Sequence, residues 1–198
     1  MLLPQLLICC LAALLIPSIA SADLVFNGSF ETGDFTGWIL SGNPIPGTVD
    51  TKNPHSGLYA ADLIAQGSPS FMEQLLATTP GAAYDLTYFL AVSEPFLAVS
   101  EPFISGATVE FVAQVNGVPV FDESNIPPQP YTRYSFPFIA TGPSTDLKFG
   151  FSNDPGAFFL DDISVNAVPE PSSVWLGLLV TAFAIVVMRR RQPASAEP

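Results

Sequence analysis

Two adjacent carboxylates, Asp161 and Asp162, form the densest charge feature of this sequence, because they interrupt an otherwise apolar segment, FFLDDISV. If the segment is a strand, its adjacent side chains point to opposite faces of a sheet, so at least one carboxylate faces inward. A buried carboxylate needs a partner. Backbone amides at a strand–loop junction would supply one, and a bound cation would supply another.

The residues needed for catalysis are sparse. His55 is the only histidine, and it lies in the segment NPHSG, whose composition is typical of a turn. No nucleophile pattern surrounds it, so a solvated turn residue is favoured over a general base. Both cysteines, Cys9 and Cys10, lie in the first apolar run and are lost if that run is removed. We therefore expect no enzymatic activity.

Sugar binding would need aromatic surfaces beside convergent polar groups. The candidate aromatic residues are Trp38, Tyr59, Tyr88 and Tyr131. Trp38 is expected in the core, whereas Tyr131 follows the segment PPQP and is expected at the surface. The sequence does not select a sugar site among them.

The charge balance excludes one class of partner. Between Asp23 and Val168, 16 acidic residues stand against three basic ones, Lys52, Arg133 and Lys148, which gives a formal charge of −13. Such a surface repels phosphate backbones, so nucleic acid is not expected as a partner. It is compatible with divalent cations.

Short alternating segments between turn clusters predict strands throughout the middle of the chain. The expected strands are residues 24–26, 57–64, 71–78, 84–92, 108–115, 134–138, 147–151 and 157–165. Asn116-Gly117 predicts a hairpin turn, since both positions tolerate positive φ. Many strands with no helical period between them predict an all-β fold, an antiparallel jelly roll or β-sandwich.

The N-terminal end has the features of a signal peptide. Residues 6–16 are nearly all apolar, and small residues at Ala20 and Ala22 predict a signal-peptidase site. Residues 1–22 are therefore expected to direct export, although no Lys or Arg precedes the apolar run. A buried N-terminal helix is the alternative.

The C-terminal end has three consecutive parts, which are an extended segment, an apolar run and a basic cluster. They are Pro169-Glu170-Pro171, residues 174–188 and Arg189-Arg190-Arg191. The prolines keep the first part extended and accessible to a protease or transpeptidase. At about 1.5 Å per residue the predicted helix 174–188 is roughly 22 Å long, short for a membrane span. The positive-inside rule places the arginines and the tail 192–198 in the cytoplasm.

This order resembles the PEP-CTERM sorting signal of Gram-negative bacteria over residues 168–191. In that family an exosortase, which is an integral-membrane enzyme, processes the signal. The resemblance implies an exported protein that is held at the inner membrane and then passes to the cell surface or to an extracellular exopolysaccharide matrix, the matrix of a biofilm. A permanent single-helix anchor is the alternative.

The domain between these ends, residues 23–167, carries framework motifs. LVFNGSFETGDFTGW at residues 24–38 and FFLDDISV at 158–165 resemble carbohydrate-binding-module-like (galactose-binding-like) jelly rolls. Several members of that family hold a structural calcium where the first and last strands meet, which implies Glu31, Asp161 and Asp162 as ligands. The matching motifs are framework motifs, so the resemblance implies the fold more strongly than the ligand.

Together these features predict a non-enzymatic, exported structural or adhesive protein of the cell surface or extracellular matrix. A glycan-binding module that holds exopolysaccharide is the alternative. The expected partners are signal peptidase, an exosortase-type enzyme, the membrane through the helix 174–188 and, in the alternative, a polysaccharide.

Overall fold

The structure, a computed structural model, describes residues 22–42, 47–93 and 109–169. No helix in these ranges is long and apolar enough to cross a membrane. The predicted signal peptide and membrane helix lie outside the described residues, apart from Ala22. Ala20 lies outside as part of that signal peptide. Five predicted residues of the sorting signal, Glu170, Pro171, Arg189, Arg190 and Arg191, also lie outside the described residues.

The described residues form eight strands. They are β1 (Ile39–Gly42), β2 (Thr48–Asp50), β3 (Ala60–Ala77), β4 (Ala83–Val92), β5 (Glu110–Val115), β6 (Val118–Ser124), β7 (Gln129–Ile139) and β8 (Ser144–Ala167). Every strand pair is antiparallel. The predicted all-β antiparallel class is therefore confirmed.

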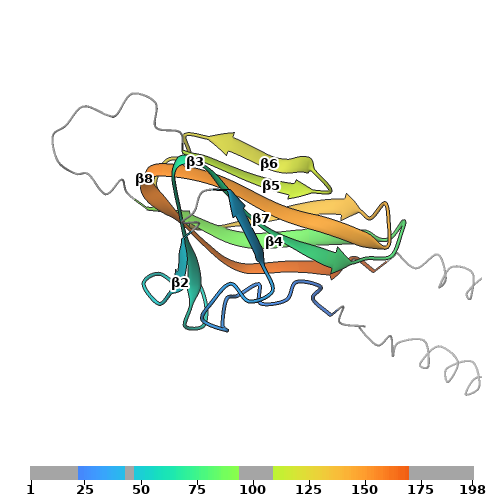
Figure 1. The fold of residues 1–198 in the computed structure, drawn as a ribbon. Coiled ribbons are helices and arrows are strands. Elements are labelled where there is room, and N and C mark those ends of the chain that lie inside the picture. The colour runs from blue at the N-terminus through green and yellow to red at the C-terminus, as the bar shows by residue number, and fades with distance from the viewer. Residues whose placement is uncertain (1–21, 43–46, 94–108, 170–198) are drawn as a thin grey trace, which may run out of the picture.

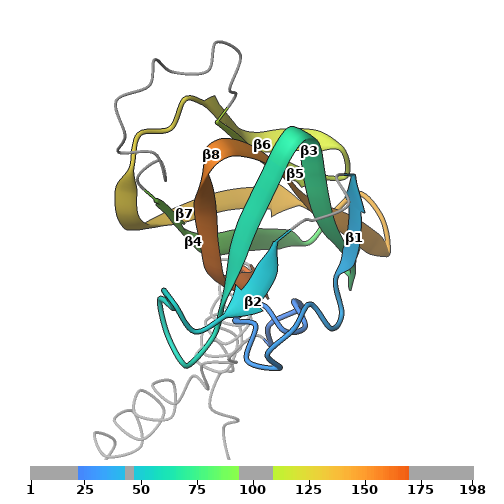
Figure 2. The same ribbon diagram turned by 60° about the vertical axis from the view of Figure 1, so that its left-hand side comes forward.

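Two long strands, β3 and β8, pass through both layers of a sandwich (Figures 1 and 2). One layer has the order β1–β3–β8–β5–β6 and uses the C-terminal half of β3 with the N-terminal half of β8. The other has the order β2–β3–β8–β4–β7 and uses the remaining halves. We call these layers the first sheet and the second sheet. The β3–β8 register shifts between Leu63 and Ser70, where the pair turns from one sheet into the other.

The core between the sheets is aromatic. Tyr88 of the second sheet is fully buried and packs edge-on against Phe149 of the first sheet, with ring centroids 5.3 Å apart. Phe111 lies 6.0 Å from Tyr88 and 5.9 Å from Phe149. Each such side chain contributes roughly 1.5–3 kcal/mol when it is removed from water. Trp38, expected in the core, is 7% exposed.

The predicted strands are partly confirmed. Asn116 and Gly117 have φ values of 51° and 73° and form the predicted β5–β6 hairpin turn. Residues 24–26 form no strand, because Leu24 bonds Val165 and the Phe26 amide bonds a side chain, that of Gln74. The sequence predicted two strands in place of β3 and two in place of β8, and it did not predict β1 or β2.

Two core tyrosines differ in how their hydroxyl groups are satisfied. The Tyr88 hydroxyl is buried without a hydrogen-bond partner among the described residues, whereas the Tyr84 hydroxyl accepts from the Thr79 amide at 2.9 Å. Tyr88→Phe removes an unsatisfied group, so we expect it to raise the free energy of unfolding by about 1 kcal/mol. Tyr84→Phe loses a bond and should lower it by a similar amount. Chemical denaturation measures both, and a destabilised Tyr88→Phe would contradict the assignment.

Candidate functional site

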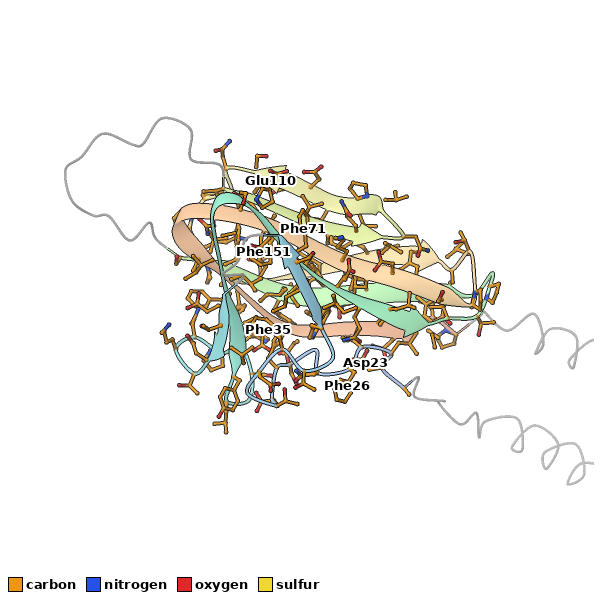
Figure 3. The ribbon with its side chains drawn as sticks, viewed as in Figure 1. Asp23, Phe26, Phe35, Phe71, Glu110 and Phe151 are labelled. Atoms are coloured by element: carbon orange, nitrogen blue, oxygen red, sulfur yellow. The ribbon has the colours of Figure 1, made fainter. Side chains whose placement is uncertain are left out.

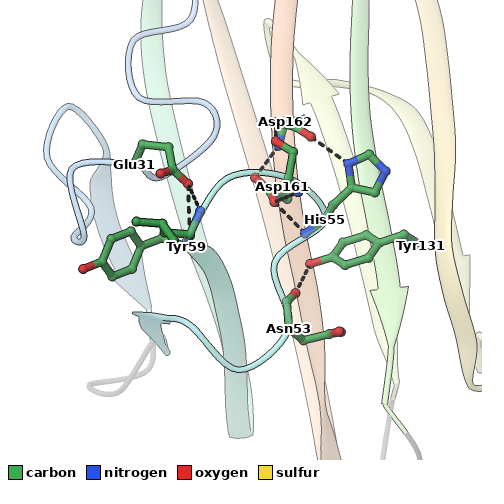
Figure 4. A network of polar contacts seen from close by, with 9 residues as sticks. Glu31, Asn53, His55, Tyr59, Tyr131, Asp161 and Asp162 are labelled. Atoms are coloured by element: carbon green, nitrogen blue, oxygen red, sulfur yellow. Dashed lines mark hydrogen bonds and ion pairs between the residues drawn. The ribbon is translucent and has the colours of Figure 1, made fainter.

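The predicted carboxylates hold one loop, residues 53–59, which connects β2 to β3 (Figure 4). Asp161 is fully buried, and its Oδ2 accepts from the amides of His55 at 2.9 Å and Ser56 at 3.1 Å. Asp162 Oδ2 lies 2.7 Å from His55 Nδ1, and its Oδ1 accepts from the Ser56 hydroxyl at 2.8 Å. The two carboxylates therefore serve the same loop.

This arrangement corrects the expectation that the two carboxylates point to opposite faces. Thr87 pairs with Ser164 while Phe89 pairs with Asp161, so Asp162 and Ile163 together oppose one residue of β4. This is a β-bulge, and Asp162 has a φ of 48° there. The bulge interrupts the alternation of the strand and turns the second carboxylate toward the loop.

Glu31 holds the other end of the loop. Its Oε1 accepts from the amides of Leu58 at 2.9 Å and Tyr59 at 3.0 Å (Figure 4). Glycine at position 57 permits this approach, because a Cβ there would collide with the Glu31 carboxylate. Gly57 also has a φ of 62°, which favours glycine. The structure thus brings all three predicted metal-binding residues to one loop, where Glu31 and Asp161 accept from backbone amides and Asp162 contacts the side chains of His55 and Ser56.

These residues do not fit calcium as they are arranged. Calcium takes six to eight oxygen ligands, and here the carboxylates are engaged by N–H and O–H donors. The described part of the chain contains no group of three or more His, Cys, Asp or Glu side chains that could hold a metal ion. The geometry supports the other interpretation from the sequence, in which backbone amides satisfy the carboxylates. The calcium site remains untested.

We expect the melting temperature to be unchanged by EDTA and by subsequent addition of calcium, because amide, hydroxyl and imidazole groups already engage these carboxylates. Differential scanning fluorimetry measures it. A rise with calcium that is lost in Glu31→Gln would contradict this expectation and support the calcium site.

Burial raises the pKa of Asp161 from 3.8 to about 6, although the amides of Ser56, Asp162 and His55 stabilise its ionised form. Between these two pH values the folded protein holds a proton that the unfolded chain releases. Stability therefore falls as the pH rises from about 4 to about 6, and it is greater on the acid side.

Asp161→Asn should remove this dependence, because an amide does not titrate. The variant is less stable at every pH, since its NH₂ group faces amide donors, yet its stability should change less between pH 4 and 6. The difference in change is on the order of 2 kcal/mol. Urea denaturation across this range measures it. Equal slopes for both proteins would refute the assigned pKa.

His55 is more than a solvated turn residue. Its ring stacks on Phe89 with centroids 3.7 Å apart, and the Tyr131 ring lies edge-on to it at 5.1 Å. The Tyr131 hydroxyl donates to the Asn53 carbonyl oxygen at 2.6 Å. These contacts assign the His55 ring to packing of the loop against the second sheet.

A second feature, on the outer face of the first sheet, was not predicted. Phe71 lies between the buried residues Ser70 and Met72, so its side chain points outward. Gly150 pairs with it on β8, and a Cβ at Gly150 would lie 2.9 Å from Phe71 Cε1. The aromatic ring therefore lies against the sheet where a side chain is missing. We call this feature the Phe71 platform, comprising Phe71 and Gly150. Figure 3 labels Phe71.

A row of polar side chains lies beside the Phe71 platform. The adjacent row of the sheet is Glu73, Lys148 and Gln114, in cross-strand register. Lys148 Nζ lies over the ring, 5.0 Å from its centroid, and 2.9 Å from Glu73 Oε2. The Lys148 ammonium therefore occupies a position over the Phe71 ring.

The sequence named other aromatic residues for sugar binding. Trp38 and Tyr88 are buried in the core, and Tyr59 and Tyr131 are half-buried beside the loop. Phe71 is one of 16 phenylalanines, so its type carries little information. The signal lies in its pairing with Gly150, which the sequence alone does not reveal.

The segment that starts at the end of β8 resembles a known sorting motif. Residues 167–192 match the PEP-CTERM protein-sorting motif. The chain carries a PEP-CTERM sorting signal. This confirms the signal expected at 168–191, and it implies an exported protein that is processed at the membrane. No curated protein sequence matches the chain.

Solved structures of carbohydrate-binding modules resemble the domain. TmCBM61, solved in complex with beta-1,4-galactotriose, is 17% identical, and the match covers 75% of this chain and 100% of that chain at a TM-score of 0.56. The CBM22-1 xylan-binding domain of Paenibacillus barcinonensis Xyn10C is 16% identical over 75% and 96%, with a TM-score of 0.52. A family 16 carbohydrate-binding module is 18% identical over 72% and 98%, with a TM-score of 0.51. At these identities the likeness shows the fold, a β-sandwich like that of carbohydrate-binding modules.

Proposed function

We propose that the domain is a non-enzymatic glycan-binding module, which its sorting signal delivers to the cell surface or extracellular matrix. Signal peptidase removes residues 1–22, an exosortase processes Pro169-Glu170-Pro171, and the helix 174–188 anchors the intermediate. The observation that carries the binding role is the Phe71 platform. It favours glycan binding, the alternative from the sequence, over a purely structural or adhesive role.

The Phe71 platform suits a sugar ring. One face of a pyranose is rich in C–H groups and packs on an aromatic plane, while its hydroxyl groups need hydrogen-bond partners at the rim. Glu73, Lys148 and Gln114 supply acceptors and donors in one row beside Phe71. On binding, the Lys148 ammonium turns from the ring to a hydroxyl group.

The charges around the platform favour an uncharged glycan. Lys148 is paired with Glu73, so the face offers no unpaired cation from this row. The domain as a whole carries a formal charge of −13 and repels polyanions. Two proteins with a similar fold are described with glycans, one in complex with beta-1,4-galactotriose and one as a xylan-binding domain, which supports glycan binding.

A glycan array probed with the full chain, in a detergent without a sugar head group, tests the function. We expect saturable binding to one class of neutral polysaccharide. Phe71→Ala should weaken it at least about tenfold, because a buried aromatic contact of this kind typically contributes more than 1.4 kcal/mol. Gly150→Val, which displaces the ring, should act in the same direction.

Leu75→Ala is the matched control, since Leu75 is 69% exposed on the same strand and two rows from the platform. It should bind as the unchanged protein does. An array without binding, or binding insensitive to Phe71→Ala, would reject the platform and leave the structural or adhesive role.

A further inference from the structure

The end of the sandwich that leads into the sorting signal carries no charged side chain. Three segments meet there, residues 78–83, 139–144 and 166–169, and none of them contains Asp, Glu, Lys, Arg or His. All 16 acidic and all three basic residues between Asp23 and Val168 lie outside these segments. We call the three segments together the uncharged end.

Backbone hydrogen bonds join the three segments of the uncharged end. The Gly81 amide donates to the Ala140 carbonyl oxygen at 2.7 Å, and the Ala140 amide donates to the Ala82 carbonyl oxygen at 3.0 Å. The Val168 amide donates to the Ala83 carbonyl oxygen at 2.9 Å. The turns that follow β3 and β7 therefore lie side by side, at the right of Figure 1. The uncharged end is thus one contiguous surface.

The uncharged end exposes several apolar side chains. Ile139 is 68% exposed and Val168 is 43% exposed. Ile139 pairs with Ala83, and the Val168 amide bonds to the same residue, so these two side chains flank the start of β4. Pro80 and Pro143 are exposed in the adjoining turns. A single exposed apolar residue is common on a protein surface, whereas a group of them indicates a contact.

The charges nearest to the uncharged end lie around its border. Asp85 is two residues beyond Ala83 on β4, and Asp146 is two residues beyond Ser144 on β8. Asp23 lies beside Val165, and after removal of residues 1–22 its new ammonium group offsets its own carboxylate. The domain as a whole has a formal charge of −13 and is repelled by anionic lipids. It therefore approaches such a surface at the lowest cost through the uncharged end.

The sorting signal brings the uncharged end close to the bilayer. Pro169 is the last described residue of this end, and the predicted membrane helix begins at residue 174. Residues 170–173 between them span at most about 17 Å, even when fully extended. The head-group layer is roughly 5–8 Å thick on each side of the hydrocarbon. The linker therefore holds the uncharged end within about 10 Å of the head groups.

We propose that the uncharged end rests on the lipid head groups of the membrane as long as the sorting signal is attached. The inference depends on the proposed anchor, helix 174–188, and adds to it a contact made by the folded domain. Ile139 and Val168 leave water on contact with the lipid, and the exposed Thr79 offers a hydroxyl group to the head groups. The contact keeps Pro169 at the membrane surface, where an integral-membrane enzyme reaches it.

NMR of the chain in lipid nanodiscs that carry a gadolinium-chelating lipid tests the proposal. The ¹⁵N-labelled chain is purified after export from cells that lack an exosortase, so that the sorting signal stays attached. The nanodiscs contain phosphatidylcholine with a minor fraction of phosphatidylglycerol. We expect gadolinium to broaden the amide signals of Gly81, Ile139 and Gly142. Ser93 follows the far end of β4, roughly 30 Å from Ala83, and its amide should keep its line width.

The variant Ile139→Glu separates contact with lipid from mere tethering, because it adds one negative charge to the uncharged end and leaves the linker unchanged. It should lower the docked population about fivefold, the effect of one charge near an anionic surface, and the broadening at Gly81 should fall with it. Leu58→Glu is the matched control, since Leu58 is 66% exposed in the loop 53–59. This control should be broadened as the unchanged chain is.

The possible results distinguish the anchor from the contact. A chain that does not co-purify with the nanodiscs overturns the anchor and this inference with it. A chain that co-purifies but is broadened equally at Gly81 and Ser93, or is insensitive to Ile139→Glu, overturns the lipid contact alone. Broadening that appears only when an exosortase shares the nanodisc overturns it too, and assigns the uncharged end to that enzyme. Glycan binding by the Phe71 platform is measured separately on the array.

Discussion

The antiparallel pairing of β3 with β8 is the constraint on which the rest of the structure depends. The pair supplies the centre of both sheets, and every strand except β6 and β7 bonds directly to one of these two. Each half of the pair then carries one candidate surface. The half in the first sheet places Gly150 beside Phe71, and the half in the second sheet carries the bulge at Asp162.

The β-bulge in β8 changes the direction of two polar groups. It turns Asp162 toward the His55 loop, and it presents the Ile163 amide to Gly28. Without it, regular alternation would point Asp162 away from Asp161, and Asp162 and Ile163 would not share one opposing residue of β4. The bulge thus adds one contact to the loop of residues 53–59 and one to the N-terminal segment.

Much of the fold could be predicted from local pattern. Alternation in residues 84–92 and the Asn116-Gly117 turn carry their own signal, because strand faces and positive φ impose residue types directly. The continuity of β3 and of β8 could not be predicted from local pattern, since residues 66–69 and 153–156 have the composition of turns. There the register of the pair shifts, and Ala65 opposite Asn153 is the one Cα pair between Leu63 and Ser70, so the strands continue because they remain paired on both sides of the shift, which is a tertiary effect. β1 and β2 are short and depend on β3 for their existence.

The candidate site was predictable to a different extent. The framework motifs correctly brought Glu31, Asp161 and Asp162 to one region, but their roles follow from which amides face them, and this depends on the loop conformation. Phe71 illustrates the opposite case. Its importance comes from the absence of a side chain at Gly150, about 80 residues away in the chain, and no local pattern encodes that.

The two ends of the described domain lie together, which connects the fold to the sorting signal. The Leu24 amide donates to the Val165 carbonyl oxygen, and the Val165 amide donates to Asp23 Oδ1. β8 ends at Ala167, where the sorting motif begins, so no spacer separates the sheet from the signal. In the proposed processing, the last strand of the sandwich would therefore also be the attachment to the membrane. Its other half, with Gly150, lies in the first sheet, so the Phe71 platform is built at the part of β8 remote from that attachment.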